Sequence, residues 1–417
     1  MKRHLIGIGG VGMSAFATAL VRLGDEVTGA DRTLGTPNIK FLESLGVKVF
    51  PDDGSGVDAA TDEVIVSTAI EETNAGLIKA KELGIPVTHR AKALARTLKD
   101  YKLVAVVGTC GKSTVTAMLG HVLAECGLDP MCVNGANVPG WEGAVRFGKG
   151  QYAVAEVDES DKSLVAFKPY AAIVTNASAD HYSKEEMDEV FDAFVKDCEG
   201  PVIDGRKGLE GLGSLEGLDV PIPGKHNLQN AQHAVLMAIA LGVEPEKAIA
   251  AMKTFRGVER RLQLIISQTF QTSKPSKPFV YDDYAHNPEK LKAMWTTLAE
   301  KHPEGICVIW RPHGYAPLRK MMDALAAMFA ETVRACDKLL LLPVYDAGGT
   351  TDRSINSSDL LEKVKVRGEG EQRWVLVSDL DAAYEWCAAH KDNYAAFVTC
   401  GARDPGLPVL ARRLSEM

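Results

Sequence analysis

The sequence predicts an α/β protein with three α/β domains in series: an N-terminal Rossmann-like domain, a central P-loop ATPase domain and a C-terminal Rossmann-like domain. Short apolar runs alternate with helical patterns along the chain, as in parallel α/β units. Glycine-rich turns follow two of the expected strands, at residues 7–12 and 108–111. At 417 residues the chain is also too long for a single core, and we expect domains at 1–97, 98–261 and 262–417.

Composition limits the class of protein. A hydrophobic content of 46% and a charged content of 24% are typical of a soluble globular protein. The net charge of −8 argues against nucleic acid or an anionic membrane as the main partner. The longest apolar runs are too short for a membrane span, and the eight cysteines contain no C-x-x-C pair. We therefore expect a cytoplasmic monomer or homodimer that acts on small molecules.

The first domain opens with a nucleotide-binding pattern. Its expected strands are 4–9, 26–31, 47–50, 63–68 and 85–90, and its expected helices are 13–24, 39–46 and 74–84. Gly7, Gly9 and Gly12 lie in the turn at the end of the first expected strand, and Asp31 ends the second strand, which matches the dinucleotide-binding fingerprint. A tight turn without a ligand would look similar. The pattern alone suits an NAD(P)-dependent oxidoreductase, and the same turn can hold the diphosphate of a UDP-sugar.

Residues 103–115, LVAVVGTCGKSTV, predict a strand, a phosphate loop and the start of a helix. Glycines let backbone N–H groups close around a polyphosphate, and the helix N-terminus adds partial positive charge. Lys112 can reach the β- and γ-phosphates, and the Ser113 hydroxyl can hold Mg²⁺. The spacing departs from the usual G-x-x-x-x-G-K-[ST] because residue 106 is valine. We expect this chain to bind ATP, and a phosphate loop has no role in hydride transfer.

Polar residues end two further strands of the second domain, expected at 152–157 and 171–176. Glu156 opens the acidic run EVDESD beside the phosphate loop, where a carboxylate could hold Mg²⁺. His181 follows the next strand and offers a second metal ligand. An acidic loop in water and a surface histidine are the ordinary alternatives. A helix is expected at 185–198.

The end of the second domain carries amides and arginines. Asn227 and Asn230 lie three residues apart on an expected helix, where they could bind an adenine edge or cap the helix. Arg260 and Arg261 stand at the joint with the third domain, and an arginine there could clamp a transferring phosphoryl group. The glycine-rich stretch at 205–220 is expected to be a surface excursion without an assigned function.

The third domain has expected strands at 262–266, 279–284, 306–311, 338–345, 373–377 and 394–400. The segment DDYAHNP ends the second of these strands and contains Asp283 and His286. The segment RPHGY ends the third and contains His313. Lone histidines at strand ends are often structural, but two such ends in one sheet favour a shared site.

Taken in order, these segments resemble the Mur ligase family, the ATP-dependent amide ligases of peptidoglycan precursor assembly. The resemblance rests on GIGGVGMS, VSTAI, GTCGKST, EVDESD, NASADH, GKHNLQN, RRLQ, DDYAHNP, RPHGY and SINSSDL. The opening HLIGIGGVGMS and the stretch LPVYDAGGTTDRSINSSDL look most like the alanine-adding branch. The resemblance implies a ligase that joins a UDP-N-acetylmuramate-type carboxylate to an amino acid, expected to be L-alanine, through an acyl phosphate.

The resemblance also implies roles for individual residues. The UDP-substrate side would be formed by Gly9, Gly10, Val11, Gly12, Met13, Asp31 and Ser67. ATP would contact Gly108, Thr109, Cys110, Gly111, Lys112, Ser113, Thr114, Asn227, Asn230, Arg261 and Asp283. Catalysis would depend on Lys112, Glu156, His181 and Arg261, with Mg²⁺ on Ser113, Glu156 and His181. The amino acid would lie near His286, His313 and Arg319.

The sequence departs from the alanine-adding branch at three places. Cys110 replaces the usual histidine of the phosphate loop, which leaves the backbone cradle intact. Gly314 and Pro317 stand where that branch has arginines near the amino acid, so Arg319, Arg311 or Lys320 would have to substitute. The segment between His181 and His226 is also shorter than in other members of this family. These departures leave open a peptide substrate, another carboxylate and amine pair, or a catalytically inactive ATP-binding regulator.

Overall fold

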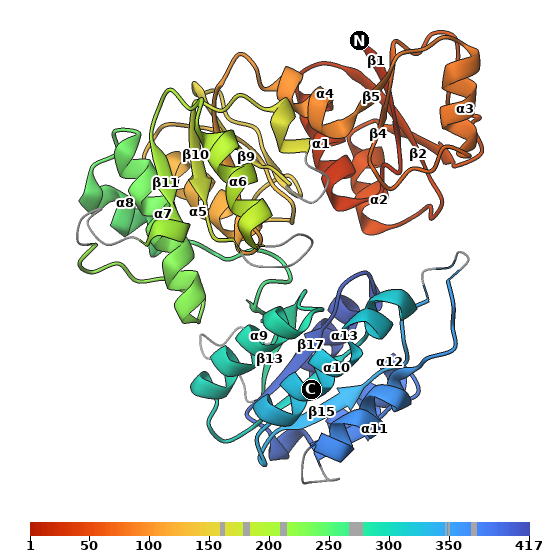
Figure 1. The fold of residues 1–417 in the computed structure, drawn as a ribbon, viewed down its shortest axis with the longest axis vertical. Coiled ribbons are helices and arrows are strands. Elements are labelled where there is room, and N and C mark those ends of the chain that lie inside the picture. The colour runs from red at the N-terminus through yellow and green to blue at the C-terminus, as the bar shows by residue number, and fades with distance from the viewer. Residues whose placement is uncertain are drawn as a thin grey trace. The chain divides into compact units, whose positions relative to one another are not determined.

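The computed structural model describes residues 1–158, 163–177, 184–208, 215–266, 278–346, 348, 351–367 and 373–417. Its residues form two compact units: one of residues 1–221 and 226–258, and one of residues 222–225 and 259–417. The first unit holds two sheets and the second holds one (Figure 1). The predicted α/β fold class, with three sheets in series, is confirmed. The domain limits at 97/98 and 261/262 stay a prediction.

The first sheet is entirely parallel, with strand order β3-β2-β1-β4-β5. Its strands are β1 (Lys2–Ile6), β2 (Glu26–Asp31), β3 (Lys48–Pro51), β4 (Glu63–Val66) and β5 (Val87–His89). Its helices are α1 (Val11–Arg22), α2 (Pro37–Ser44), α3 (Ala75–Glu82) and α4 (Arg90–Thr97). The strands that come after β1 lie on both sides of it, with β2 and β3 on one side and β4 and β5 on the other. The carboxyl end of β1 is therefore the switch point of this sheet, where ligands bind in such folds.

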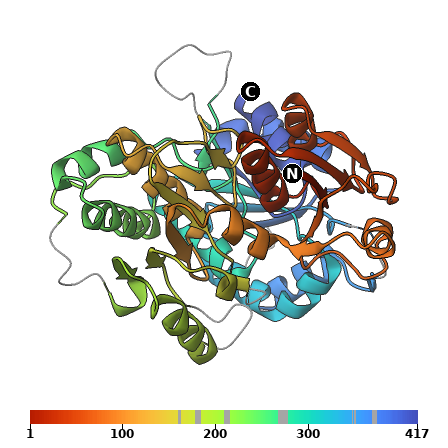
Figure 2. The ribbon, with the colours of Figure 1, turned by 90° about the horizontal axis from the view of Figure 1, so that it is seen from above.

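The second sheet has the order β11-β10-β6-β9-β7-β8, and only β7 and β8 pair antiparallel. Its strands are β6 (Lys102–Val107), β7 (Met131–Val133), β8 (Val145–Arg146), β9 (Tyr152–Glu156), β10 (Ala171–Val174) and β11 (Val202–Asp204). Its helices are α5 (Lys112–Glu125), α6 (Lys184–Val195), α7 (Lys225–Ala240) and α8 (Pro245–Met252), with short 3-10 turns η1 (Ser163–Ala166) and η2 (Gly205–Lys207). Figure 2 shows the green helices α7 and α8 on one side of this sheet and the yellow-green α6 on the other.

The third sheet has the order β12-β13-β17-β14-β15-β16, with only β12 antiparallel to its neighbour. Its strands are β12 (Gln263–Leu264), β13 (Phe279–Asp283), β14 (Ile306–Trp310), β15 (Lys338–Leu341), β16 (Trp374–Leu376) and β17 (Ala396–Cys400). Its helices are α9 (Pro288–Lys301), α10 (Tyr315–Thr332), α11 (Ser357–Arg367), α12 (Leu380–Ala389) and α13 (Gly406–Ser415), with a 3-10 turn η4 (Lys391–Asn393). The neighbours β13, β17 and β14 therefore carry three adjacent loops at their carboxyl ends.

The first two sheets share one hydrophobic core. Phe16 of α1, Leu98, Leu103 of β6 and Phe191 of α6 belong to a single cluster of buried residues. Burial of apolar side chains at about 25 cal/mol per Å² is the main stabilising contribution in such a cluster. An ion pair between Arg22 Nε and Glu142 Oε2, 2.6 Å long, joins the same two parts of the unit.

The sequence analysis missed three short strands. Strands β7, β8 and β11 contain three, two and three residues, which is too few for a periodic pattern to indicate them. Helix α6 begins at Lys184 and ends at Val195, three residues before the predicted end. In every helix that the structure describes, the residues are too few or too polar to cross a membrane.

Candidate active site

The phosphate loop follows β6, which lies between β9 and β10 near the middle of the second sheet. Gly108 has a φ of 128°, and a Cβ there would overlap the Thr175 hydroxyl. Gly111 caps α5 with a φ of 85°, and a Cβ there would lie 2.6 Å from Asn230 Oδ1. Both positions therefore require glycine because of backbone conformation and of space.

The end of β10 braces this loop. Asn176 Oδ1 accepts hydrogen bonds from Thr109 Oγ1 at 2.7 Å and from the Cys110 N–H at 2.9 Å. The Cys110 carbonyl accepts from Thr175 Oγ1 at 2.6 Å and from Asn176 Nδ2 at 3.0 Å. The loop is therefore held in place by side chains of the neighbouring strand end. Asn176 was missed by the sequence analysis, although it opens the segment NASADH that was singled out for its histidine.

The first turn of α5 carries the expected phosphate and metal groups. Lys112 Nζ donates a hydrogen bond to the Gly108 carbonyl at 2.7 Å, so the ammonium lies over the loop. Ser113 and Thr114 are buried at the start of the helix. Backbone N–H groups and a lysine at a helix N-terminus form the arrangement that binds polyphosphate.

Glu156 lies beside this loop, as the sequence predicted. It ends β9 and pairs in register with Val106 of β6, two residues before Gly108. Its Oε2 accepts a hydrogen bond from the Gly135 N–H at 2.8 Å. His181 lies outside the described residues, and no cluster of three metal-binding side chains occurs among those described. Glu156 and Ser113 are oxygen ligands of the kind that Mg²⁺ prefers.

Helix α7 presents a row of buried polar residues to the phosphate loop. Asn227 and Asn230 lie inside the helix rather than at its cap, and Asn230 Nδ2 is 3.4 Å from Asn227 Oδ1. Asn230 Oδ1 lies against Gly111, as described above. One turn further, His233 is buried, and neither ring nitrogen has a hydrogen-bond partner within the described ranges. Burial lowers the pKa of His233 to about 4, so the ring is neutral at physiological pH.

The glycine turn of the first sheet is braced in a similar way. Asp31 Oδ2 accepts from the Gly9 N–H at 2.8 Å, and Asn38 Nδ2 donates to the Gly9 carbonyl at 2.9 Å. Gly10 caps α1 without a side-chain hydrogen bond, so the first-turn N–H groups have no side-chain cap. Val11 is exposed, whereas the Met13 side chain is buried in the core. Only the backbone of Met13 can therefore face a diphosphate.

Arg90 adds a cation to this turn and was missed by the sequence analysis. A Cβ on Gly12 would lie 3.4 Å from Arg90 Nη1, so the guanidinium packs against the first turn of α1. Arg90 follows β5 and Ser67 follows β4, at the same edge of the sheet as the glycine turn. Inspection of every residue that follows a strand would have found Arg90, because the carboxyl ends of parallel strands meet at one edge.

In the second unit, residues 260–262, which lead into β12, are held by an ion pair between Arg260 and the buried Asp282. Arg260 and Leu262 have φ values of 59° and 46°, which are unfavourable for residues with a side chain. Arg260 Nε donates to Asp282 Oδ2 at 3.0 Å, and Arg260 Nη2 donates to the Gly401 carbonyl at 2.5 Å. Burial raises the pKa of Asp282 to about 6, although Arg260 opposes this shift.

Arg261 directly follows the residue that makes these contacts. Arg261 lies over the Tyr284 ring, with 5.3 Å between the guanidinium carbon and the ring centroid. Asp283 accepts from the backbone N–H groups of Leu262 and Ala285, each at 2.7 Å. Asp283, a predicted ATP contact, therefore also ties residues 260–262 to the end of β13.

His286 and His313 lie together in the same unit, as the two strand ends predicted. Their ring centroids are 4.8 Å apart. Burial lowers the pKa of each ring to about 4, and nearby positive charges contribute: Lys290 and Arg261 for His286, Arg403 and Lys290 for His313. Arg319 is held by Asp352, with 2.8 Å between Arg319 Nη2 and Asp352 Oδ2.

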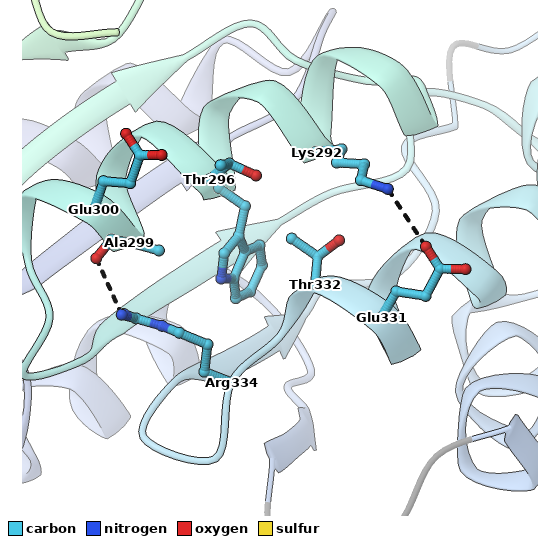
Figure 3. Close-up of a pocket in the computed structure, with 8 residues that line it drawn as sticks. Lys292, Thr296, Ala299, Glu300, Glu331, Thr332 and Arg334 are labelled. Atoms are coloured by element: carbon cyan, nitrogen blue, oxygen red, sulfur yellow. Dashed lines mark hydrogen bonds and ion pairs between the residues drawn. The ribbon is translucent and has the colours of Figure 1, made fainter.

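A separate groove of about 450 Å³ lies between α9 and α10. Trp295 of α9 is among the residues that line it. An ion pair of 3.4 Å joins Lys292 of α9 to Glu331 of α10 (Figure 3). Arg334 donates to the Ala299 carbonyl at the other end of the groove. None of the predicted site residues lines it.

Comparison with known proteins decides the family. The description "Mur ligase family, catalytic domain" matches residues 2–102, and "Mur ligase, glutamate ligase domain" matches residues 260–403. The UDP-N-acetylmuramate--L-alanine ligase of Rhizobium etli is 30% identical to this chain, over 90% of the chain and 89% of that protein. The chain belongs to the Mur ligase family.

Two other relatives agree with this assignment. The UDP-N-acetylmuramate--L-alanine ligase of Paenarthrobacter aurescens is 33% identical, over 82% of this chain and 83% of that protein. The crystal structure of UDP-N-acetylmuramate-alanine ligase from Thermotoga maritima matches with a TM-score of 0.81 and 25% identity, over 100% of this chain and 98% of that one. The chain is thus an ATP-dependent amide ligase of peptidoglycan precursor synthesis, and the oxidoreductase alternative has no support.

Proposed function

We propose that this Mur ligase joins the carboxylate of UDP-N-acetylmuramate to L-alanine while ATP is converted to ADP and phosphate. The observation that carries the proposal is the braced phosphate loop with Glu156 on the adjacent strand, in a chain that spans nearly all of its relatives. The reaction for which those relatives are named supports the substrate pair.

The chemistry follows from the difficulty of attacking a carboxylate, whose leaving group would be oxide. The substrate carboxylate attacks the γ-phosphate of ATP, ADP leaves, and an acyl phosphate forms. The amine then attacks the acyl carbon, and phosphate leaves. Both steps concentrate negative charge on phosphoryl or carbonyl oxygens, which the Lys112 ammonium and the loop N–H groups can stabilise. Arg261 stays a predicted catalytic residue.

We propose that ATP lies on residues 108–114, with its adenine near Asn227 and Asn230. The buried carboxamides support this role because they are inside α7 and so do not serve as caps. If Mg²⁺ binds, the Ser113 hydroxyl and the Glu156 carboxylate fit it, and the ion would supply further positive charge at the phosphates. His181 remains a predicted third ligand.

The UDP-sugar is proposed to bind at the glycine turn of the first sheet. The N–H groups of residues 10–13 and the guanidinium of Arg90 suit a diphosphate, because a helix N-terminus and a cation both favour phosphate charge. Asp31 braces the loop through Gly9, and Ser67 follows the adjacent strand β4.

The amine is proposed to enter at His286 and His313. Since both rings are neutral above a pKa of about 4 and cations surround them, this site favours a neutral amine over an ammonium ion. Only the neutral amine has a lone pair for attack. The free state of all eight cysteines agrees with action in a reducing cytoplasm. Whether the protein acts as a monomer or homodimer stays a prediction.

The test is ATP-dependent phosphate release with UDP-N-acetylmuramate and a panel of twenty amino acids and two short peptides. Release that requires both UDP-N-acetylmuramate and L-alanine supports the proposal. Release with a peptide alone would replace alanine by a preformed peptide, and silence with ATP still bound would overturn the proposal. Lys112→Ala should abolish turnover while the variant keeps the melting temperature of the wild type.

A further inference from the structure

The amino-acid side of the site has no arginine at the positions expected from the alanine-adding branch, which are Gly314 and Pro317. An α-carboxylate bound there without a positive partner would be costly. The two arginines that the sequence analysis named as substitutes are already engaged. Arg319 pairs with Asp352 at 2.8 Å, and Arg311 pairs with Asp404 at 2.6 Å.

Arg403 offers a different source of charge. It follows β17, the strand between β13 and β14, so its loop lies between the two loops that carry His286 and His313. Backbone hydrogen bonds join the three loops: the Gly401 N–H donates to the Asp283 carbonyl at 3.1 Å, and the Arg311 N–H donates to the Cys400 carbonyl at 3.1 Å. Arg403 is therefore in the middle of the edge that holds the histidine pair.

The guanidinium of Arg403 lies near Gly314, one of the two positions where the alanine-adding branch has an arginine. A Cβ built on Gly314 would lie 3.9 Å from Arg403 Nη1, so the charge of Arg403 lies where an arginine at residue 314 would begin. Arg403 has a φ of 63°, which costs about 1 kcal/mol or more for a residue with a Cβ. Such strain is concentrated at binding and catalytic sites.

The carboxylates of this edge are occupied by other groups. Asp404 accepts from Arg311 and from the Gly406 N–H. Asp282 accepts from Arg260 and Thr399. Over the described ranges of the chain, Arg403 has no hydrogen bond or ion pair, and it is exposed to solvent. Arg403 thus adds a positive charge to this edge, while the Asp404 and Asp282 carboxylates are engaged by other groups.

We propose that Arg403 binds the α-carboxylate of the incoming amino acid. This assignment rests on the proposed function and adds the residue that recognises the acid group of the amine substrate. A guanidinium binds a carboxylate through two parallel N–H donors, which fixes the direction of the amine as well as its affinity. The amine would then project toward His286 and His313.

The experiment compares Arg403→Gly with the wild type in the phosphate-release assay. Glycine suits the positive φ, so this variant should fold without strain. We expect the KM for L-alanine to rise roughly 10- to 100-fold, as for loss of a charged hydrogen-bonding pair. The KM values for ATP and UDP-N-acetylmuramate should stay within twofold. Arg403→Lys should recover part of the affinity because it keeps the charge but lacks the two-pronged geometry.

The matched control is Arg412→Ala, which removes one exposed positive charge from α13 of the same unit. L-Alaninamide, which has no carboxylate, supplies the decisive comparison. The wild type should prefer L-alanine, and Arg403→Gly should reduce that preference by the same factor as the KM change. An unchanged preference, or an equal rise in all three KM values, would overturn the role of Arg403. If the wild type itself uses no amino acid, the proposed function fails first and the role of Arg403 fails with it.

Discussion

The carboxamide of Asn176 binds both backbone groups of Cys110, since Oδ1 accepts from its N–H at 2.9 Å and Nδ2 donates to its carbonyl at 3.0 Å. This contact joins the strand end after β10 to the middle of the phosphate loop. It fixes the Cys110 peptide whatever side chain residue 110 carries. The replacement of the usual histidine by cysteine is therefore compatible with an intact phosphate cradle.

We expect Asn176→Ala to weaken ATP binding without unfolding the protein. The variant loses the two hydrogen bonds to Cys110, each worth about 1 kcal/mol, so the KM for ATP should rise roughly 30-fold. Asn74→Ala is the control, because Asn74 caps α3 in the first sheet and should affect melting temperature alone. Steady-state kinetics and thermal melts of both variants make the comparison. An unchanged KM for ATP in Asn176→Ala would contradict the bracing role.

Gly111 and Gly127 provide a matched pair on one helix. Both have left-handed φ values, 85° and 81°, and they flank the two ends of α5. A Cβ on Gly111 would meet Asn230 Oδ1 at 2.6 Å, whereas a Cβ on Gly127 would meet nothing within 4 Å. Gly127→Ala should cost only the strain of the backbone, about 1–2 kcal/mol. Gly111→Ala should also abolish nucleotide binding, measured by calorimetric titration with ATP. If both variants bind ATP equally well, the overlap with Asn230 does not control nucleotide binding.

Arg90→Ala should affect the UDP-sugar alone. The guanidinium packs against Gly12, so its loss removes one charged partner of the proposed diphosphate. We expect the KM for UDP-N-acetylmuramate to rise roughly 10- to 100-fold, with the KM for ATP unchanged. Lys92→Ala, an exposed change on the same helix α4, is the control for charge. If UDP binds both variants equally in a titration, Arg90 does not contact the diphosphate.

The Arg260–Asp282 pair should give the activity a pH dependence. Because burial raises the pKa of Asp282 to about 6, this carboxyl takes up a proton as the pH falls through 6 and the ion pair with Arg260 is lost. Arg261 then loses its support, so kcat/KM for ATP should fall below pH 6. His286 and His313 titrate with a pKa of about 4 and should not add a step there.

Folding stability should change in the opposite direction. Since the pKa of Asp282 in the folded protein exceeds the ordinary value of 3.8, its contribution to stability is complete below that value and is lost as the pH rises through 6. Asp282→Asn should remove the step in both profiles, in kinetics from pH 5 to 8 and in thermal melts. Persistence of the kinetic step at pH 6 in Asp282→Asn would assign it to another group.

Local patterns predicted elements such as β6 with its phosphate loop and the helix that carries Asn227 and Asn230, but not that these two side chains are buried. The same patterns placed Glu156 at the end of β9, beside the loop. They missed Asn176, Arg90 and Arg403, because the direction in which a single polar side chain turns depends on the neighbouring strand and not on spacing in the sequence. Arg319 illustrates the same limit, since its pairing with Asp352 joins residues 33 positions apart.

The common core beneath the first two sheets has a consequence for how such an enzyme could diversify. Leu98 and Leu103, on either side of the short connection between those sheets, are buried in one cluster with Phe16 and Phe191. Recombination between genes at residue 97 would break that cluster and leave two halves with unmatched apolar faces. A crossover after residue 258, where the longer segment of the second unit begins, would leave it whole. New amine specificities could therefore be acquired by exchange of the last unit, while the first two sheets are inherited together.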